Sequence, residues 1–320
     1  MIKFARLTTN TVLSVLFILV PHGMQAQSQT QTPTQAQAKP ANVPVTTIVT
    51  VLGPSFTAPP VLGKSDVIVH TGNRREDVTA WFPAQGDNAA LQLAVLIDDG
   101  AADFGQHLEE LRRFIQAQPK TTNIGVFYAS TGMTVTAAPF SADHDAVAKK
   151  VRITFGSTGT STSIYLSLID VLRKVRSLPG RREILLIGDG HDRLRGDLPE
   201  SPDLDSVIAS AQRSGIVVHT LYTRVGRLGR ASFSLTLAQG NLTLVAGETG
   251  GQAFFQGLET PVSYTPFLDQ LDMALHNQHF LTFTTPRSLK RKGEFRAFKV
   301  TTEQRNTAIT APSRAYVPGP

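Results

Sequence analysis

The sequence predicts an α/β fold in which a doubly wound, mainly parallel sheet is flanked by a small β module. Three observations support this. The apolar run Leu91–Asp98 ends in a carboxylate, and two later apolar runs, at 183–187 and 215–221, have the same character. Amphipathic helix patterns alternate with these runs, as crossovers between parallel strands require. Shorter β-rich runs precede and follow this region.

The first 26 residues have the pattern of a secretory signal peptide. Lys3 and Arg6 precede an apolar run at 11–20, and small residues lead to a cleavage site after Ala26. A run of about 10 apolar residues is too short to span a bilayer, which requires roughly 20. We therefore expect an exported protein, periplasmic or secreted, with no transmembrane anchor after cleavage. Residues 27–44 are rich in Gln, Thr, Pro and Ala, and we expect a disordered linker there.

Composition excludes several classes of function. The chain contains no cysteine, so neither disulfides nor thiol chemistry are available to it. Removal of Lys3 and Arg6 with the signal peptide lowers the formal net charge from +6 to +4. Basic clusters occur at 224–230 and 287–292, but no aromatic residues are interleaved with them for base stacking. We therefore expect no nucleic acid partner.

The middle of the chain divides into a β-rich segment and a main α/β region. Residues 45–86 contain short strands between Gly and Pro turns, and strands and helices alternate from 87 to 260. The strand at 91–98 delivers Asp98 to the carboxyl edge of the sheet, where ligands bind in open α/β folds. Further strands are predicted at 123–129, 133–138, 183–187 and 215–221, and helices at 104–115, 141–151, 164–175 and from Ser201 onward.

The last segment, 261–320, is expected to combine one helix with two strands. Phe267, Leu271 and Leu275 have helical spacing, and strand-like runs follow at 279–284 and 295–301. These strands are predicted to return to the β module formed by residues 45–86.

Four short motifs occur in order along the main region. They are the strand ending at Asp98, the Gly/Thr-rich loop at 156–165, the strand end Asp189-Gly190 and the turn Thr249-Gly-Gly251. In this order they resemble a von Willebrand factor type A domain, whose fold is Rossmann-like. The flanks resemble the VWFA-related family described from acidobacteria, and together the resemblance covers nearly all of residues 45–318; the flanking segments are 65–69, 277–283 and 293–300.

The resemblance implies a metal-ion-dependent adhesion site at the carboxyl edge. Domains of this type hold a divalent cation through an Asp-x-Ser-x-Ser motif, a Thr and a second Asp, which here fall on Asp98, Thr162 and Asp189. The two serines fall on Gly100 and Ala102, which have no side-chain oxygen, so the predicted site is degenerate. Mg²⁺ prefers near-octahedral oxygen ligands, and the expected cofactor is Mg²⁺, another divalent cation or none. Without metal, Asp98 and Asp189 are expected to form a polar floor hydrogen-bonded to loop amides.

Four further residues are candidates for a site. His191 and Asp192 follow Asp189 directly and either line the same edge or lie in a solvated loop. His276 and His279 have the spacing of paired metal ligands but lack a third ligand nearby in the sequence, which favours a capping or surface role.

An enzymatic function is weighed against the binding function. The segment 188–192 is similar to an acidic motif of haloacid-dehalogenase-like phosphatases. Those enzymes need Asp-x-Asp at the first strand, whereas Asp98 and Asp99 are adjacent and point to opposite sides of an extended chain. Serine-nucleophile and phosphate-loop motifs are missing from the sequence.

We therefore expect a non-enzymatic, exported protein-binding or adhesion module whose protein ligand the sequence does not identify. The alternatives are a structural scaffold without metal dependence and, third, the phosphatase.

Overall fold

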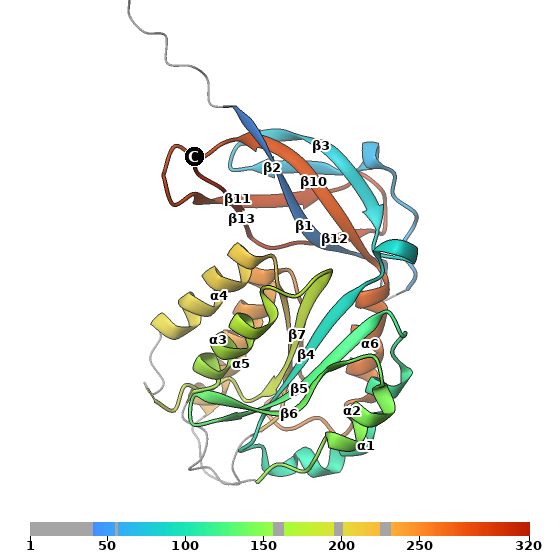
Figure 1. The fold of residues 1–320 in the computed structure, drawn as a ribbon, viewed down its shortest axis with the longest axis vertical. Coiled ribbons are helices and arrows are strands. Elements are labelled where there is room, and N and C mark those ends of the chain that lie inside the picture. Colours follow the sequence, from blue (N-terminus) through green and yellow to red (C-terminus); the bar gives the residue numbers. More distant parts are fainter. Residues whose placement is uncertain (1–40, 55–56, 156–162, 195–200, 225–231) are drawn as a thin grey trace, which may run out of the picture. The chain divides into compact units, whose positions relative to one another are not determined.

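The main region forms a six-stranded sheet in the order β6-β5-β4-β7-β8-β9 (Figure 1). The computed structural model describes residues 41–54, 57–155, 163–194, 201–224 and 232–320, so the predicted signal peptide and most of the predicted linker lie outside the described residues. Neighbouring strands are parallel except for the edge strand β6, which runs antiparallel to β5. The strands are β4 Leu91–Asp98, β5 Thr122–Ser130, β6 Met133–Ser141, β7 Arg181–Gly188, β8 Val217–Tyr222 and β9 Ala253–Phe254.

Helices cover both faces of this sheet (Figure 1). One face packs against α1, α2 and α6, and the other packs against α3, α4 and α5. The bounds of the helices are α1 Leu108–Ala117, α2 His144–Lys150, α3 Ile164–Val175, α4 Pro202–Ser214, α5 Ser232–Thr249 and α6 Thr265–His276.

Strand β4 is buried along its whole length because it lies at the centre of these layers. Leu93, Val95 and Ile97 belong to the core shared with α1 and α6, whereas Ala94 and Leu96 belong to the core on the opposite face. A strand buried on both faces has no need of polar alternation, which explains the continuous apolar run in the sequence. The same layers bring Asp98 to the carboxyl edge, where the apolar run stops.

The segments before and after the main region form a second, antiparallel sheet in the order β12-β1-β10-β3-β2-β11-β13. Its buried face holds Val45, Val69, Phe283 and Val300. The longest pairing joins β1 to β10, so chain segments more than 200 residues apart lie side by side. This sheet confirms the β module and, with the parallel sheet, the predicted fold class. Its strands are β1 Asn42–Leu52, β2 Ile68–Thr71, β3 Arg74–Pro83, β10 Gln278–Pro286, β11 Glu294–Thr301, β12 Ala308–Thr310 and β13 Arg314–Val317.

Several local features differ from the predicted elements. Strand β9 was not predicted, and segment 261–320 contains β12 and β13 besides the two predicted strands. Helix α5 was not predicted, because Gly240, Gly247 and several threonines lower its helix propensity. The predicted helix from Phe104 begins as a 3-10 turn, Ala102–His107, before α1. Strand β1 begins at Asn42, three residues before the predicted run. Short 3-10 turns also occur at Lys64–Asp66 and Gly86–Asn88.

None of the helices in the described ranges is long and apolar enough to cross a membrane.

Candidate functional site

The two aspartates predicted from the strand ends meet at the carboxyl edge. Strands β4 and β7 are parallel neighbours, so Asp98 at the end of β4 and Asp189 just after β7 lie at the same edge. Both are buried, with 0% and 1% of the residue exposed. The backbone N–H of Gly100 donates to Asp98 Oδ1 at 2.9 Å, and that of His191 donates to Asp189 Oδ1 at 3.1 Å. The predicted hydrogen bonds from loop amides to this pair are therefore present.

Arg193 lies between the two carboxylates. Its Nη2 donates to Asp189 Oδ2 at 2.5 Å, and its Nη1 lies 3.7 Å from Asp98 Oδ2. The arginine side chain is only 11% exposed. A buried charge is tolerated when it is paired and hydrogen-bonded, so the guanidinium supplies positive charge that offsets both aspartates.

Asp99 faces a different arginine. Arg152 donates from Nη1 and Nη2 to the two oxygens of Asp99, both at 2.8 Å, in the bidentate geometry that suits a guanidinium and a carboxylate. The N–H of Phe155 adds a third hydrogen bond at 3.2 Å. The hydrogen bonds with Asp99 raise the pKa of Arg152, and its guanidinium lies over the rings of Tyr128 and Phe155. This pair fastens the 151–155 loop to the end of β4.

The remaining predicted residues of the edge, His191 and Asp192, are buried in the loop after β7. Asp192 accepts a hydrogen bond from the N–H of Leu194 at 3.2 Å and one from the Ser201 hydroxyl at 3.4 Å. Ser201 in turn caps helix α4. Asp192 therefore links the segment that follows β7 to the first residue before α4, and both His191 and Asp192 are buried rather than solvated.

Gly190 is required by the packing of this loop. Its φ is +76°, and a Cβ at this position would lie 2.4 Å from the carbonyl oxygen of Ala238 in α5. The hydroxyl of Tyr165, a residue of α3, donates to the Gly190 carbonyl at 2.6 Å. The Asp189-Gly190 motif is thus held between two helices.

The side chains present do not fit a divalent cation. Gly100 and Ala102 offer no side-chain oxygen, and Asp98 and Asp189 already face the guanidinium of Arg193. In the part of the chain that the structure describes, no group of three or more His, Asp or Glu side chains is arranged to hold a metal ion. The third predicted ligand, Thr162, lies outside the described residues, so the metal site at Asp98, Thr162 and Asp189 stays a prediction.

Three exposed apolar side chains, called the apolar rim below, lie in the two chain segments that contribute Arg152 and Arg193. Ile153 and Phe155 extend from the loop after α2, and Leu194 extends from the loop after β7; they are 62%, 72% and 58% exposed. Sequence analysis identified neither this rim nor Arg193. The signal for Arg193 was an arginine four residues after Asp189, within the same loop.

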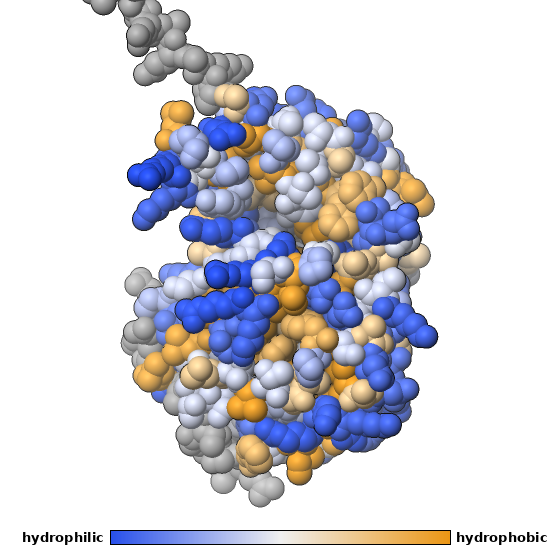
Figure 2. All heavy atoms as spheres, viewed as in Figure 1, coloured by the Kyte–Doolittle hydropathy of each residue, from blue (hydrophilic) through white to orange (hydrophobic). Residues whose placement is uncertain are grey.

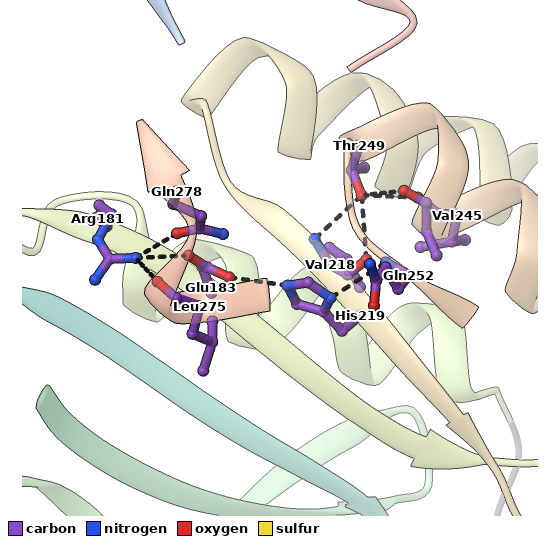
Figure 3. Close-up of polar contacts among 10 residues, drawn as sticks. Arg181, Glu183, Val218, His219, Val245, Thr249, Gln252, Leu275 and Gln278 are labelled. Carbon is purple, nitrogen blue, oxygen red and sulfur yellow. Dashed lines mark hydrogen bonds and ion pairs between the residues drawn. The ribbon is translucent and has the colours of Figure 1, made fainter. Parts of the chain in front are cut away.

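A second polar cluster lies at the amino edge, where the parallel strands begin (Figure 3). Glu183 is fully buried, accepts from His219 Nε2 at 2.9 Å and lies 3.7 Å from Arg181 Nη1. The N–H of Gln252 donates to His219 Nδ1 at 3.2 Å, so the ring proton lies on Nε2. Arg181 also donates to the Leu275 carbonyl at 3.0 Å and to the side-chain oxygen of Gln278. This relay connects β7 and β8 with α6 and β10.

The turn Thr249-Gly-Gly251 has a structural role beside this relay (Figure 3). The Thr249 hydroxyl accepts from the N–H of Val218 at 3.1 Å and donates to the Val245 carbonyl at 2.8 Å. A Cβ on Gly251 would lie 2.0 Å from the Val218 carbonyl oxygen. The motif therefore fastens the end of α5 to β8.

His276 and His279 do not converge. The Nδ1 of His276 lies 2.8 Å from the Asp272 carbonyl oxygen, one turn back at the end of α6, whereas the His279 ring stacks on Trp81 with ring centroids 4.4 Å apart. Burial lowers the pKa of His279. The contact of His276 agrees with the predicted capping role, whereas His279 packs against Trp81, which was not predicted; neither contact supports a shared metal.

No protein-family model matches this chain, and no curated protein matches it. Among solved structures, it is similar to an aerotolerance-related membrane protein from Bacteroides fragilis, at 15% identity and a TM-score of 0.42 over 58% of this chain and 98% of that one. It is also similar to the human COPII-coat protein Sec24c, at 8% identity and a TM-score of 0.44 over 72% of this chain and 44% of that one. A third similar structure is the ArnB paralog VWA2 from Sulfolobus acidocaldarius, at 10% identity and a TM-score of 0.41 over 84% and 76%.

Likenesses this distant assign neither a family nor a function. The von Willebrand A-like type of fold rests on the chain's own strand order and on the helices that cover both faces of the sheet. Membership of the acidobacterial family stays a prediction.

Proposed function

We propose that this chain is an exported, non-enzymatic module that binds a protein ligand at the carboxyl edge of its parallel sheet. The observation that carries the proposal is the exposed apolar rim of Ile153, Phe155 and Leu194, in the same chain segments as Arg152 and Arg193 of the buried charged cluster. Aromatic side chains and arginine are enriched at protein interfaces, and exposed apolar side chains beside them add area that a partner can bury. The periplasmic or secreted location is supported by the signal-peptide pattern of residues 1–26.

Two residues of the apolar rim are held by buried aspartates through their backbone N–H groups. Phe155 is fastened through its own N–H to Asp99, and its ring lies against Arg152, with 4.2 Å between the guanidinium carbon and the ring centroid. Leu194 is fastened through its N–H to Asp192. Side chains that are already positioned lose less conformational entropy on binding, which favours recognition by this surface.

We further propose that recognition at this edge requires no divalent cation. Arg193 supplies the positive charge beside Asp98 and Asp189, at the place where the resemblance implies a metal. The two hydroxyl groups that would coordinate a metal are missing, because Gly100 and Ala102 occupy those positions. Adhesion through a bridging cation is therefore less well supported than binding without a cation.

A non-enzymatic role is supported by the partners of the adjacent aspartates. Asp99 is held by Arg152, and Asp98 faces Gly100 and Arg193. A phosphatase needs one carboxylate to attack and a second for proton transfer at the same reacting group, and these two face different neighbours. Turnover of a phosphate monoester that disappears in Asp98→Ala would contradict the proposal.

Capture of secreted proteins on the immobilised chain tests the surface. The double variant Phe155→Ser, Leu194→Ser removes two anchors, and we expect the affinity for the captured partner to fall by about 30-fold or more, as for interface anchors of ~2 kcal/mol. The matched control is Val61→Ser, Leu289→Ser, which removes two apolar side chains exposed at 98% and 84% elsewhere on the chain. Equal affinity of both double variants would exclude the carboxyl edge as the binding surface.

Chelation tests the role of metal in the same assay. We expect capture by the unmodified chain to be the same in EDTA and in millimolar Mg²⁺, Mn²⁺ or Ca²⁺. Two results together would support metal-dependent binding instead. Capture would be lost in EDTA, and a cation would raise the melting temperature of the unmodified chain saturably but not that of Asp189→Ala. In that case Gly100→Ser with Ala102→Ser should tighten cation binding.

A further inference from the structure

A cavity of about 250 Å³ lies at the amino edge of the parallel sheet, where β7 and the loop before β8 meet strands β1 and β13 of the second sheet. Arginines are prominent among its lining residues, and no aspartate or glutamate lines it; the arginines are Arg181, Arg182, Arg213 and Arg314. Hydrophilic side chains gather between the two sheets on the face shown in Figure 2. The cavity is separate from the carboxyl edge, which is at the opposite ends of the same strands.

The guanidinium of Arg182 is partly buried, and not all of its N–H groups have hydrogen-bond acceptors. Its Nη1 donates to the Arg176 carbonyl at 2.7 Å, while its Nε is buried without a hydrogen-bond partner. No aspartate or glutamate among the described residues lies within ion-pair distance of its guanidinium. Burial lowers the pKa of Arg182, because its charge has lost water without gaining a counter-charge. A bound anion would supply both the counter-charge and the missing acceptors.

Arg213 and Arg314 complete the positive lining from the other side. The exposed Arg213, near the end of α4, lies over the rings of Tyr316 and Phe295, at 5.0 Å and 5.6 Å from the ring centroids. Arg314 lies over Phe295 at 5.2 Å, its Nε is buried without a hydrogen-bond partner, and Glu248 lies 4.0 Å away. Arginine heads stacked on aromatic rings keep a defined orientation, so their N–H groups are pre-organised for a ligand.

Arg181 differs from the other three because it is already paired. Glu183 lies 3.7 Å from its Nη1, and Gln278 and the Leu275 carbonyl accept its hydrogen bonds. Its charge therefore belongs to the buried relay. The surplus positive charge of the cavity comes from Arg182 and Arg213, with a contribution from Arg314.

We propose that this cavity is a binding site for a small oxyanion, the phosphate or carboxylate group of a small molecule. Guanidinium groups present paired N–H donors that match the oxygens of phosphate and carboxylate. The volume suits the anionic head of a ligand, since pockets for whole drug-sized molecules start at about 300 Å³. The site does not depend on the protein-binding function of the carboxyl edge, and either proposal can fail without the other.

The test is calorimetric titration and thermal shift of the full chain with inorganic phosphate and, separately, with acetate, each at constant ionic strength against chloride. We expect saturable heat and a rise in melting temperature with at least one of them. Binding by phosphate alone or by acetate alone identifies the chemical class. Arg182→Gln and Arg213→Gln should each weaken binding by about 10-fold or more, the effect of losing one charge-assisted contact of ~1.4 kcal/mol.

The control is Arg113→Gln, which removes the same charge from an exposed position on α1. It should bind the anion as the unmodified chain does. Because Arg213 is exposed, its variant is expected to fold, and circular dichroism verifies this. The proposal is overturned if neither oxyanion stabilises the chain more than chloride does, or if Arg113→Gln weakens binding as much as Arg213→Gln.

Discussion

The two edges of the parallel sheet use arginine in opposite ways. At the carboxyl edge, Arg193 and Arg152 are each placed against buried aspartates. At the amino edge, Arg182 and Arg213 line a cavity and have no carboxylate within 4.0 Å among the described residues. The residue type is the same, and the counter-charge decides its role. A guanidinium that is neutralised internally holds loops together, whereas one that is desolvated without a carboxylate is available to an anion.

This difference predicts different kinds of recognition at the two edges. The charges of the carboxyl edge are largely satisfied within the chain, so a partner gains most from the apolar rim of Ile153, Phe155 and Leu194. At the amino edge a ligand gains by supplying charge. Binding at the carboxyl edge should therefore depend weakly on salt, and binding at the amino edge strongly.

The largest effect is expected from breaking the arginine pairing at the carboxyl edge. Arg193→Met leaves Asp98 and Asp189 buried without this cation, and we expect a loss of about 3–5 kcal/mol in the free energy of unfolding, measured by urea denaturation. Arg113→Met, on the exposed face of α1, is the control and should change stability by less than about 0.5 kcal/mol.

The Arg193→Met variant also tests whether Arg193 takes the place of a metal ion. Removal of Arg193 takes away the positive charge that Asp98 and Asp189 face, and Mg²⁺ should then raise the melting temperature of Arg193→Met but not that of the unmodified chain. A loss below about 1 kcal/mol, the range of exposed ion pairs, would show that Arg193 does not hold the edge together.

An intermediate effect is expected where a carboxylate is held by hydrogen bonds rather than by arginine. Glu110 of α1 accepts from the Ser263 hydroxyl, from the N–H and hydroxyl of Thr265, and lies 3.0 Å from His107 Nδ1. Burial opposes its ionisation, but these hydrogen bonds prevail and lower the pKa of Glu110 to about 2 from its ordinary value of 4.5. The carboxylate thereby fastens the start of α6 to α1.

The sign of the pH dependence follows from the lowered pKa. Since the folded state binds its proton less readily than the unfolded chain, Glu110 stabilises the fold above about pH 4.5, and this contribution is lost as the pH falls toward 2. Glu110→Gln should cost ~1 kcal/mol at pH 7, as for a lost helix cap, and the difference from the unmodified chain should shrink in that acidic window. A difference that is constant with pH would contradict the role of the charge.

The smallest effect on stability is expected at the amino edge. Arg213 has no carboxylate partner among the described residues, so Arg213→Gln should change the free energy of unfolding by less than about 0.5 kcal/mol in the absence of oxyanions. The same substitution should abolish most of the stabilisation by the bound anion. A loss comparable to that in Arg193→Met would show that the two edges do not differ.

The fold was predictable because its strands carry the strongest kind of signal. Leu91–Asp98 and the run at 183–187 are apolar without alternation, as strands covered on both faces must be. Helix α5 could not be predicted in the same way, because its apolar and polar residues do not separate into two faces and it contains Gly240 and Gly247. Its helical state is imposed by packing against β8 and the loop at Gly190.

The two aspartates of the site could be predicted from the sequence, whereas the contact of Arg193 with both of them could not. Strand ends predicted that Asp98 and Asp189 lie at one edge. The position of Arg193 four residues after Asp189 was the available signal for the cation, but spacing alone does not show that its guanidinium also reaches Asp98. The apolar rim was missed for a similar reason, since Ile153 and Phe155 lie in a loop without periodic pattern. The cavity at the amino edge combines residues from five separate segments of the chain, which only the folded chain brings together.

The relay from His219 through Glu183 and Arg181 to Gln278 limits which parts of the chain can be exchanged by recombination. Its members come from both sheets, and the arginine and the glutamate are each buried. Transplanting the α/β layers without β10 would remove Gln278, one of the acceptors of the buried Arg181, which would keep the Leu275 carbonyl of α6 and the nearby Glu183 as partners. We therefore expect the α/β layers to tolerate transfer to another protein only together with β10 and the sheet that contains it.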